Sequence, residues 1–135
     1  MNYKVDKIEG IGPKFAEVLG KAGIKNTKQL LDHAAAKKGR KDLAEKTGLD
    51  EQKILKWANM CDLMRIKGVA EEFSELLEAA GVDTVKELAQ RKPENLWKAI
   101  CEANTKSKLV RQTPGLPQVE SWVTQAKALP PTMTY

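Results

Sequence analysis

Apolar residues recur along this chain at intervals of three and four positions, which is the spacing of a helix with one buried face. The pattern is clearest over residues 13–22, 50–64, 93–101 and 117–129. Alternation with a period of two, the pattern of a half-buried strand, does not extend over any useful length. The hydrophobic pattern therefore predicts an all-α fold.

Glycine and short polar residues divide the predicted helices. Gly23 follows the first helix and is typical of a C-terminal stop. Asn26, with Gln29 three residues later, predicts an N-cap and a capping box for the next helix. Residues 37–41, Lys-Lys-Gly-Arg-Lys, are interpreted as a basic loop that precedes a helix starting at Leu43.

Two segments of the chain occur twice. Residues 8–30 match residues 66–88 without a gap, and the matches include the turn glycine, the phenylalanine and leucine of the following helix, and the polar cap. A second match relates residues 54–64 to residues 119–129. So many ungapped matches indicate an internal repeat.

The repeat predicts the domain organisation. We expect two related halves, residues 1–65 and residues 66–135, that pack as one compact helical domain. Trp57 and Trp122 fall at equivalent places in the two halves. Because each recurs at helical spacing beside other apolar residues, we expect both in the core.

The most distinctive stretch is Ile-Glu-Gly-Ile-Gly-Pro-Lys-Phe, residues 8–15. Gly10 and Gly12 flank one apolar residue, and we expect glycine to supply the positive φ that a tight hairpin needs. Pro13 suits the first turn of the next helix, where an N–H group is not needed. The turn thus places exposed backbone at the N-terminus of a helix, where free N–H groups favour the binding of a phosphate.

This stretch resembles the helix-hairpin-helix family, whose members commonly hold the DNA backbone without reading bases. The whole chain resembles a bacterial family of domains of unknown function that is built from tandem copies of this motif. Residues 81–88 also resemble the hairpin region of the C-terminal domain of the RNA polymerase alpha subunit. The resemblance implies two tandem helix-hairpin-helix repeats and a nucleic-acid contact through Gly10, Ile11, Gly12 and Lys14.

Charge favours the first half of the chain as the site of such a contact. The formal net charge is +5; residues 1–60 contain 13 Lys and Arg against 8 Asp and Glu, whereas residues 61–135 are balanced. An anionic partner would be steered to the first half. The predicted contact therefore includes the cations of the basic stretch: Lys37, Lys38, Arg40 and Lys41.

The second repeat differs at the corresponding turn. Ala70, Glu71 and Glu72 stand where the first repeat has Gly12, Pro13 and Lys14. Two carboxylates repel a phosphate, although they suit a helix N-terminus. We therefore do not expect both hairpins to hold one duplex.

Two alternatives remain open. Ala44, Gly48 and Ile54 are spaced as in a helix-turn-helix, although any tight corner between two helices favours the same small and apolar residues. The hairpins can also be plain packing elements of a protein-interaction or assembly module. In that case the acidic residues near Glu71 and Glu72 would engage a basic partner.

Composition argues against catalysis. His33 is the only histidine, and Cys61 and Cys101 stand far apart without the spacing of a metal site. We expect a non-enzymatic protein that needs no cofactor. No apolar run approaches the ~20 residues of a membrane span, and no leader pattern is visible, so we expect a cytoplasmic protein without a membrane partner. The sequence leaves open the oligomeric state and the choice between DNA and RNA.

Overall fold

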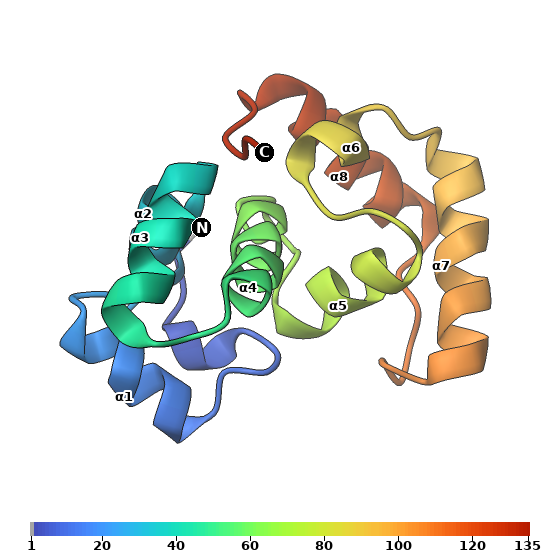
Figure 1. The fold of residues 1–135 in the computed structure, drawn as a ribbon. Helices are drawn as coiled ribbons and strands as arrows, with labels where there is room; N and C mark the ends of the chain where they lie inside the picture. The colour runs from blue at the N-terminus through green and yellow to red at the C-terminus, as the bar shows by residue number, and fades with distance from the viewer. Residues whose placement is uncertain (1) are drawn as a thin grey trace. The chain divides into compact units, whose positions relative to one another are not determined.

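The computed structural model describes residues 2–135 (Figure 1). These residues form one 3-10 turn, η1 (Val5–Lys7), and eight α-helices. The helices are α1 (Pro13–Lys21), α2 (Thr27–Ala34), α3 (Lys37–Thr47), α4 (Glu51–Leu63), α5 (Glu71–Ala79), α6 (Val85–Ala89), α7 (Pro93–Ser107) and α8 (Leu116–Ala128). Between residues 2 and 135 no strand is present, and an isolated bridge pairs Lys4 with Asn26. The prediction of an all-α fold is confirmed.

The described residues divide into two compact units. The first unit comprises residues 2–62 together with the tail, residues 132–135, and the second comprises Leu63–Pro131. In the first unit α2 packs on α3, and in the second unit α6 and α7 both pack on α8. Each unit therefore has helices enough to bury its own apolar faces.

Aliphatic side chains build most of both cores. The first core contains the fully buried Leu19, Ile24, Leu30, Ala34, Ile54 and Ala58. The second contains Ile66, Val69, Leu76, Leu77, Val82, Val85, Leu88, Leu96, Ile100 and Val119. Trp57 and Trp122 are also buried, which confirms their predicted place in the interior.

The same turn precedes α1 and α5. The Ile11 N–H donates to the Ile8 carbonyl over 3.1 Å, and the Val69 N–H donates to the Ile66 carbonyl over 3.1 Å. Gly10 has φ +93°, and its counterpart in the second turn has φ +97°. Glycine is favoured at this position because other residues rarely adopt a positive φ.

The helices that follow the turns also end alike. Gly23 takes φ +85° after α1, as the predicted stop requires. The Ile24 N–H then donates to the Leu19 carbonyl over 2.9 Å, and the Val82 N–H donates to the Leu77 carbonyl over 2.9 Å. Each bond satisfies a carbonyl in the last turn of its helix and reverses the chain direction.

The predicted N-caps are present as well. Asn26 Oδ1 accepts from the Gln29 N–H over 2.8 Å, and Thr84 Oγ1 accepts from the Glu87 N–H over 3.3 Å. The Gln29 side chain accepts from the Lys25 N–H over 2.8 Å, one residue before the cap. This reciprocal bond is a shifted form of the expected capping box.

The basic stretch is helical, so its prediction as a loop is wrong. α3 begins at Lys37 and not at Leu43. Lysine and arginine are good helix formers. Gly39 lies inside α3 without interrupting it. Because Gly39 has no side chain, α3 can approach α2 closely. A Cβ on Gly39 would collide with the carbonyl oxygen of His33.

Candidate nucleic-acid interface

The turn between η1 and α1 exposes backbone at two glycines. Gly10 and Gly12 are exposed, whereas Ile11 between them is buried and anchors the turn. Gly12 caps α1 with φ −86° and ψ −173°, so the expected positive φ occurs at Gly10 and is wrong for Gly12. Ala70 adopts a similar extended conformation in the second turn, with φ −114° and ψ −160°. This explains why alanine is tolerated there.

The start of α1 is open to a ligand. The first helical N–H with a backbone partner is that of Ala16, which donates to the Gly12 carbonyl over 3.0 Å. The N–H groups of Lys14 and Phe15 precede this bond and face out of the helix end. A Cβ on Gly12 would meet no atom within 4 Å. The helix end therefore offers partial positive charge without steric cover.

Two lysines flank this helix end. The Lys14 side chain is exposed beside the turn. The ammonium of Lys53, from the first turn of α4, lies 5.1 Å from the centroid of the Phe15 ring. Phe15 in turn packs on Trp57, with ring centroids 5.3 Å apart. A cation–π contact of this kind keeps the Lys53 charge close to α1.

Lys53 does not belong to the contact that the sequence predicts. It directly precedes Ile54, which lies in the second helix of the possible helix-turn-helix. That corner is present: α3 ends at Gly48 with φ +74°, and Asp50 Oδ1 accepts from the Gln52 N–H over 3.1 Å at the start of α4. The helical spacing from Trp57 back to Lys53, four residues, is the signal that links Lys53 to Phe15.

The cations of the basic stretch lie apart from the hairpin. Lys37, Lys38 and Lys41 are exposed on the first turns of α3. The last turn of α3 is the part near α1, because Lys46 lines a hollow together with Val18 of α1. Eleven residues of helix span about 16 Å. Figure 1 accordingly shows α1 at one end of this unit and the start of α3 at the other.

Arg40 is buried and serves the interior. Its side chain is 3% exposed. Nη1 donates to the carbonyls of Ala34 and Ala35 over 2.9 and 3.0 Å, and Nη2 donates to the Thr134 carbonyl over 2.8 Å. The guanidinium also lies 5.5 Å from the centroid of the Tyr135 ring. Arg40 thus caps the C-terminal end of α2 and holds the tail, and we leave it out of the interface.

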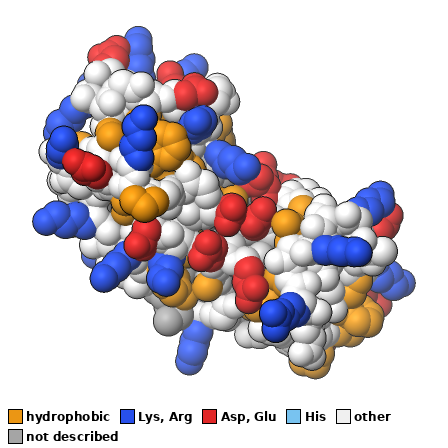
Figure 2. Space-filling model, turned by 90° about the horizontal axis from the view of Figure 1, so that it is seen from below, with side chains coloured by type: hydrophobic (Ala, Val, Ile, Leu, Met, Phe, Trp, Pro, Cys, Tyr) orange, Lys and Arg blue, Asp and Glu red, His pale blue; other side chains and the backbone are white. Residues whose placement is uncertain are grey.

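Basic side chains form no single broad patch on the face shown in Figure 2. Lys and Arg side chains are spread over this face, with acidic side chains between them. Lys21 of α1, for example, pairs with Glu17 over 3.5 Å. The charge excess of the first half is therefore distributed, and the hairpin offers a local contact.

The second turn has the same backbone with other charges. Glu71 and Glu72 occupy the first turn of α5 and suit its N-terminus. Gln118 of α8 stands where α4 has Lys53, at the same spacing before the buried tryptophan. The flanking lysines of the first unit are thus replaced by a carboxylate and an amide.

No metal site emerges from the described part of the chain, and one of the two thiols is a core group. Within residues 2–135 no group of three or more His, Cys, Asp or Glu side chains is placed to hold a metal ion. Burial, with a smaller contribution from the Asp62 carboxylate, raises the pKa of the Cys61 thiol far above its usual range. Cys61 is therefore a protonated core residue.

Comparisons with known proteins place the chain in a family. No helix among the described residues combines the length and apolar character that a membrane crossing needs. No solved structure matches this chain. A family model described as a domain of unknown function (DUF4332) matches residues 9–129, which include most of both units. The expected membership of a family of domains of unknown function is thereby confirmed: the chain belongs to the DUF4332 family.

Proposed function

We propose that the chain consists of two tandem helix-hairpin-helix repeats and that the first repeat binds the sugar-phosphate backbone of nucleic acid, duplex DNA in particular, without reading bases. The activity is non-enzymatic. One observation carries the proposal: the uncovered N-terminus of α1 follows a glycine turn and is flanked by Lys14 and Lys53. These are the donors and charges that a phosphate requires.

The equivalence of the two turns supports the assignment of repeats. The turn hydrogen bond, the positive-φ glycine, the closing bond of the helix and the N-cap recur at matching positions. The aromatic pair recurs too, since Phe15 and Trp57 stand 5.3 Å apart at 55°, and Phe73 and Trp122 stand 5.3 Å apart at 53°. Chance similarity does not reproduce backbone and side-chain geometry together.

The contact we propose is small. Backbone N–H groups and two lysines engage one or two phosphates, and such contacts fix position without carrying sequence information. Lys37, Lys38 and Lys41 lie at the other end of α3 and contribute only general attraction. The second hairpin takes no part, because Glu71 and Glu72 repel a phosphate.

Titration of a short labelled duplex tests the proposal. Each neutralised phosphate adds about 0.9 to the slope of log affinity against log salt, so two contacts weaken binding about ten-fold between about 50 and 200 mM salt. Duplexes of unrelated sequence should bind alike. An absence of affinity at low salt for both duplex and single strands would dismiss the nucleic-acid function and leave the alternative, a protein-interaction or assembly module.

A further inference from the structure

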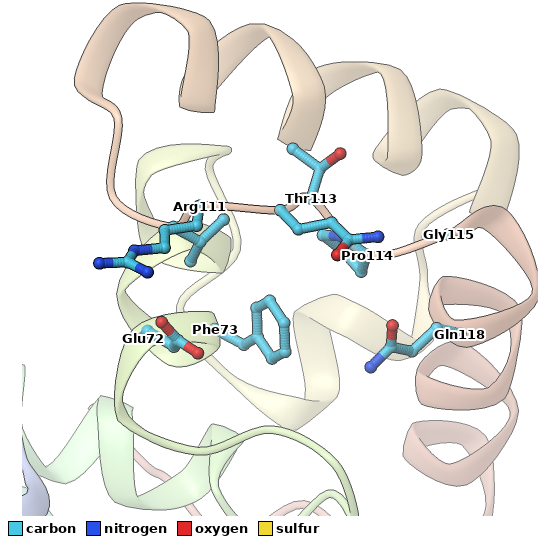
Figure 3. Close-up of a pocket in the computed structure, with 9 residues that line it drawn as sticks. Glu72, Phe73, Arg111, Thr113, Pro114, Gly115 and Gln118 are labelled. Atoms are coloured by element: carbon cyan, nitrogen blue, oxygen red, sulfur yellow. The ribbon is translucent and has the colours of Figure 1, made fainter.

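The second unit contains a hollow of about 490 Å³ that has an aromatic floor (Figure 3). Glu72 and Phe73 come from the start of α5, Gln118 comes from α8, and Arg111, Thr113 and Pro114 come from the connection between α7 and α8. Figure 3 shows the Phe73 ring between the carboxylate of Glu72 on one side and the amide of Gln118 on the other.

The connection that walls this hollow is fixed in place by α7. Asn104 makes two hydrogen bonds with Val110, accepting from its N–H over 3.0 Å and donating to its carbonyl over 3.1 Å. Trp97 Nε1 donates to the Pro114 carbonyl over 3.0 Å. Because both ends of the segment are held, the hollow is formed before any ligand arrives, which lowers the entropic cost of binding.

The first unit has an equivalent aromatic ring, Phe15, and a lysine ammonium lies over it. Phe73 and Trp122 pack as Phe15 and Trp57 do, with the same 5.3 Å separation. In the first unit the Lys53 ammonium lies 5.1 Å from the Phe15 centroid. At the corresponding position of the second unit stands Gln118, which is neutral. Lys53 thus covers the ring of Phe15, whereas the equivalent position of the second unit supplies no cation to the ring of Phe73.

A carboxylate stands at the rim of the hollow, beside the aromatic ring. Glu72 replaces Lys14, so a carboxylate stands beside the ring where the first repeat has an ammonium. Arg111 also lines the hollow, and Figure 3 shows its guanidinium on the far side of Glu72 and directed away from Phe73. Arg111 weakens the field of Glu72 without occupying the space over the ring.

We propose that this hollow binds the side chain of a lysine from a protein partner, with the ammonium over Phe73 and beside Glu72. The aromatic face and the carboxylate attract the charge together. Gln118 supplies a side-chain amide for the peptide backbone next to the lysine. The site lies wholly in the second unit, so it does not depend on nucleic-acid binding by the first.

NMR on the full chain tests this site. The probe is the peptide acetyl-Gly-Gly-Lys-Gly-Gly-amide, and its matched control carries norleucine in place of lysine. The Phe73 ring signals and the Gln118 side-chain amide should shift with the lysine peptide, which should bind about two- to five-fold more tightly than the control. Equal affinity of the two peptides, or unchanged Phe73 and Gln118 signals, would overturn the proposal.

Three variants sharpen the result. Gln118→Lys copies the first unit and should block the probe by filling the site from within; undiminished binding to this variant contradicts the proposal. Glu72→Gln should weaken binding about two- to five-fold, and Arg111→Gln should strengthen it. The two variants must change the affinity for the lysine peptide in opposite directions, because a purely structural effect would change both affinities in the same direction.

Discussion

A Cβ atom on Gly10 would stand 3.3 Å from Nε1 of Trp57. Gly68 and Trp122 repeat this relationship, with a separation of 3.2 Å. The turn glycine therefore meets two demands at once, a positive φ and a close approach to the tryptophan of the last helix of its repeat. Each turn packs against an indole ring, and this contact fixes the position of the turn backbone.

We predict that Gly10→Ala destabilises the protein more than Gly12→Ala does. Alanine at φ +93° costs about 1–3 kcal/mol, and its methyl group crowds Trp57. Gly12 is the matched control, since its φ is −86° and no atom lies within 4 Å of a Cβ there. Denaturant unfolding of both variants checks the difference. Equal losses would show that the two glycines are not distinguished as the structure requires.

We predict that Arg40→Ala lowers the free energy of unfolding by at least about 2 kcal/mol. The change leaves the buried Ala34 carbonyl without its donor, which costs about 1–3 kcal/mol, and it also removes the bond to the Thr134 carbonyl, whereas the Ala35 carbonyl keeps the Thr134 N–H as its donor. Lys41→Ala, at the exposed neighbour, is the control and should stay within about 0.5 kcal/mol. A loss as small as that of Lys41→Ala would mean that the tail and the end of α2 do not need Arg40.

We predict that Cys61 makes stability fall at alkaline pH. Burial raises the pKa of the folded-state thiol, whereas the unfolded thiol ionises near about pH 8.5. The folded state then holds the proton more tightly, so its advantage is complete below that pH and is lost as pH rises above it.

The decline reaches at most about 1.4 kcal/mol per pH unit for this one group. Urea unfolding between about pH 7 and pH 10 measures it, with Cys61→Ala as the reference that lacks the titration. Parallel pH profiles for the wild type and Cys61→Ala would show that the thiol ionises alike in both states.

Much of the fold was predictable because local signals and tertiary packing agree. Gly23 ends α1, Asn26 caps α2, and the buried tryptophans lie on the helical faces that the spacing indicated. The basic stretch was misjudged because its composition resembles a loop. The helix propensity of lysine and arginine favours α3, and two contacts without a local signal support it, namely Gly39 against α2 and Arg40 against Thr134, 94 residues away.

The candidate site was predictable only in part. Lys14 follows the turn directly, and its place beside the helix end could be inferred from the sequence. The spacing shows only that Lys53 and Trp57 share one helical face; that this face packs on Phe15 is a tertiary contact, so the sequence alone does not assign Lys53 to the hairpin. Analogy with Gly10 predicts a positive φ at Gly12. Gly12 is instead an extended N-cap residue with a negative φ, which does not require glycine.

We propose that the first hairpin, and no other basic region, contacts the nucleic-acid backbone. Charge reversal at two exposed lysines of the first unit separates the contribution of the hairpin from that of the basic stretch. Lys14→Glu and Lys38→Glu change the net charge equally, so any difference between them reports position. Both side chains are exposed, and both proteins should retain the fold.

The decisive measurement is duplex affinity against salt for the wild type and these two variants. We predict that Lys14→Glu weakens binding to all sequences alike and flattens the slope of log affinity against log salt by about one unit. Lys38→Glu should leave the slope as it is in the wild type. Equal flattening by the two variants, or none by Lys14→Glu, would contradict binding through the first hairpin.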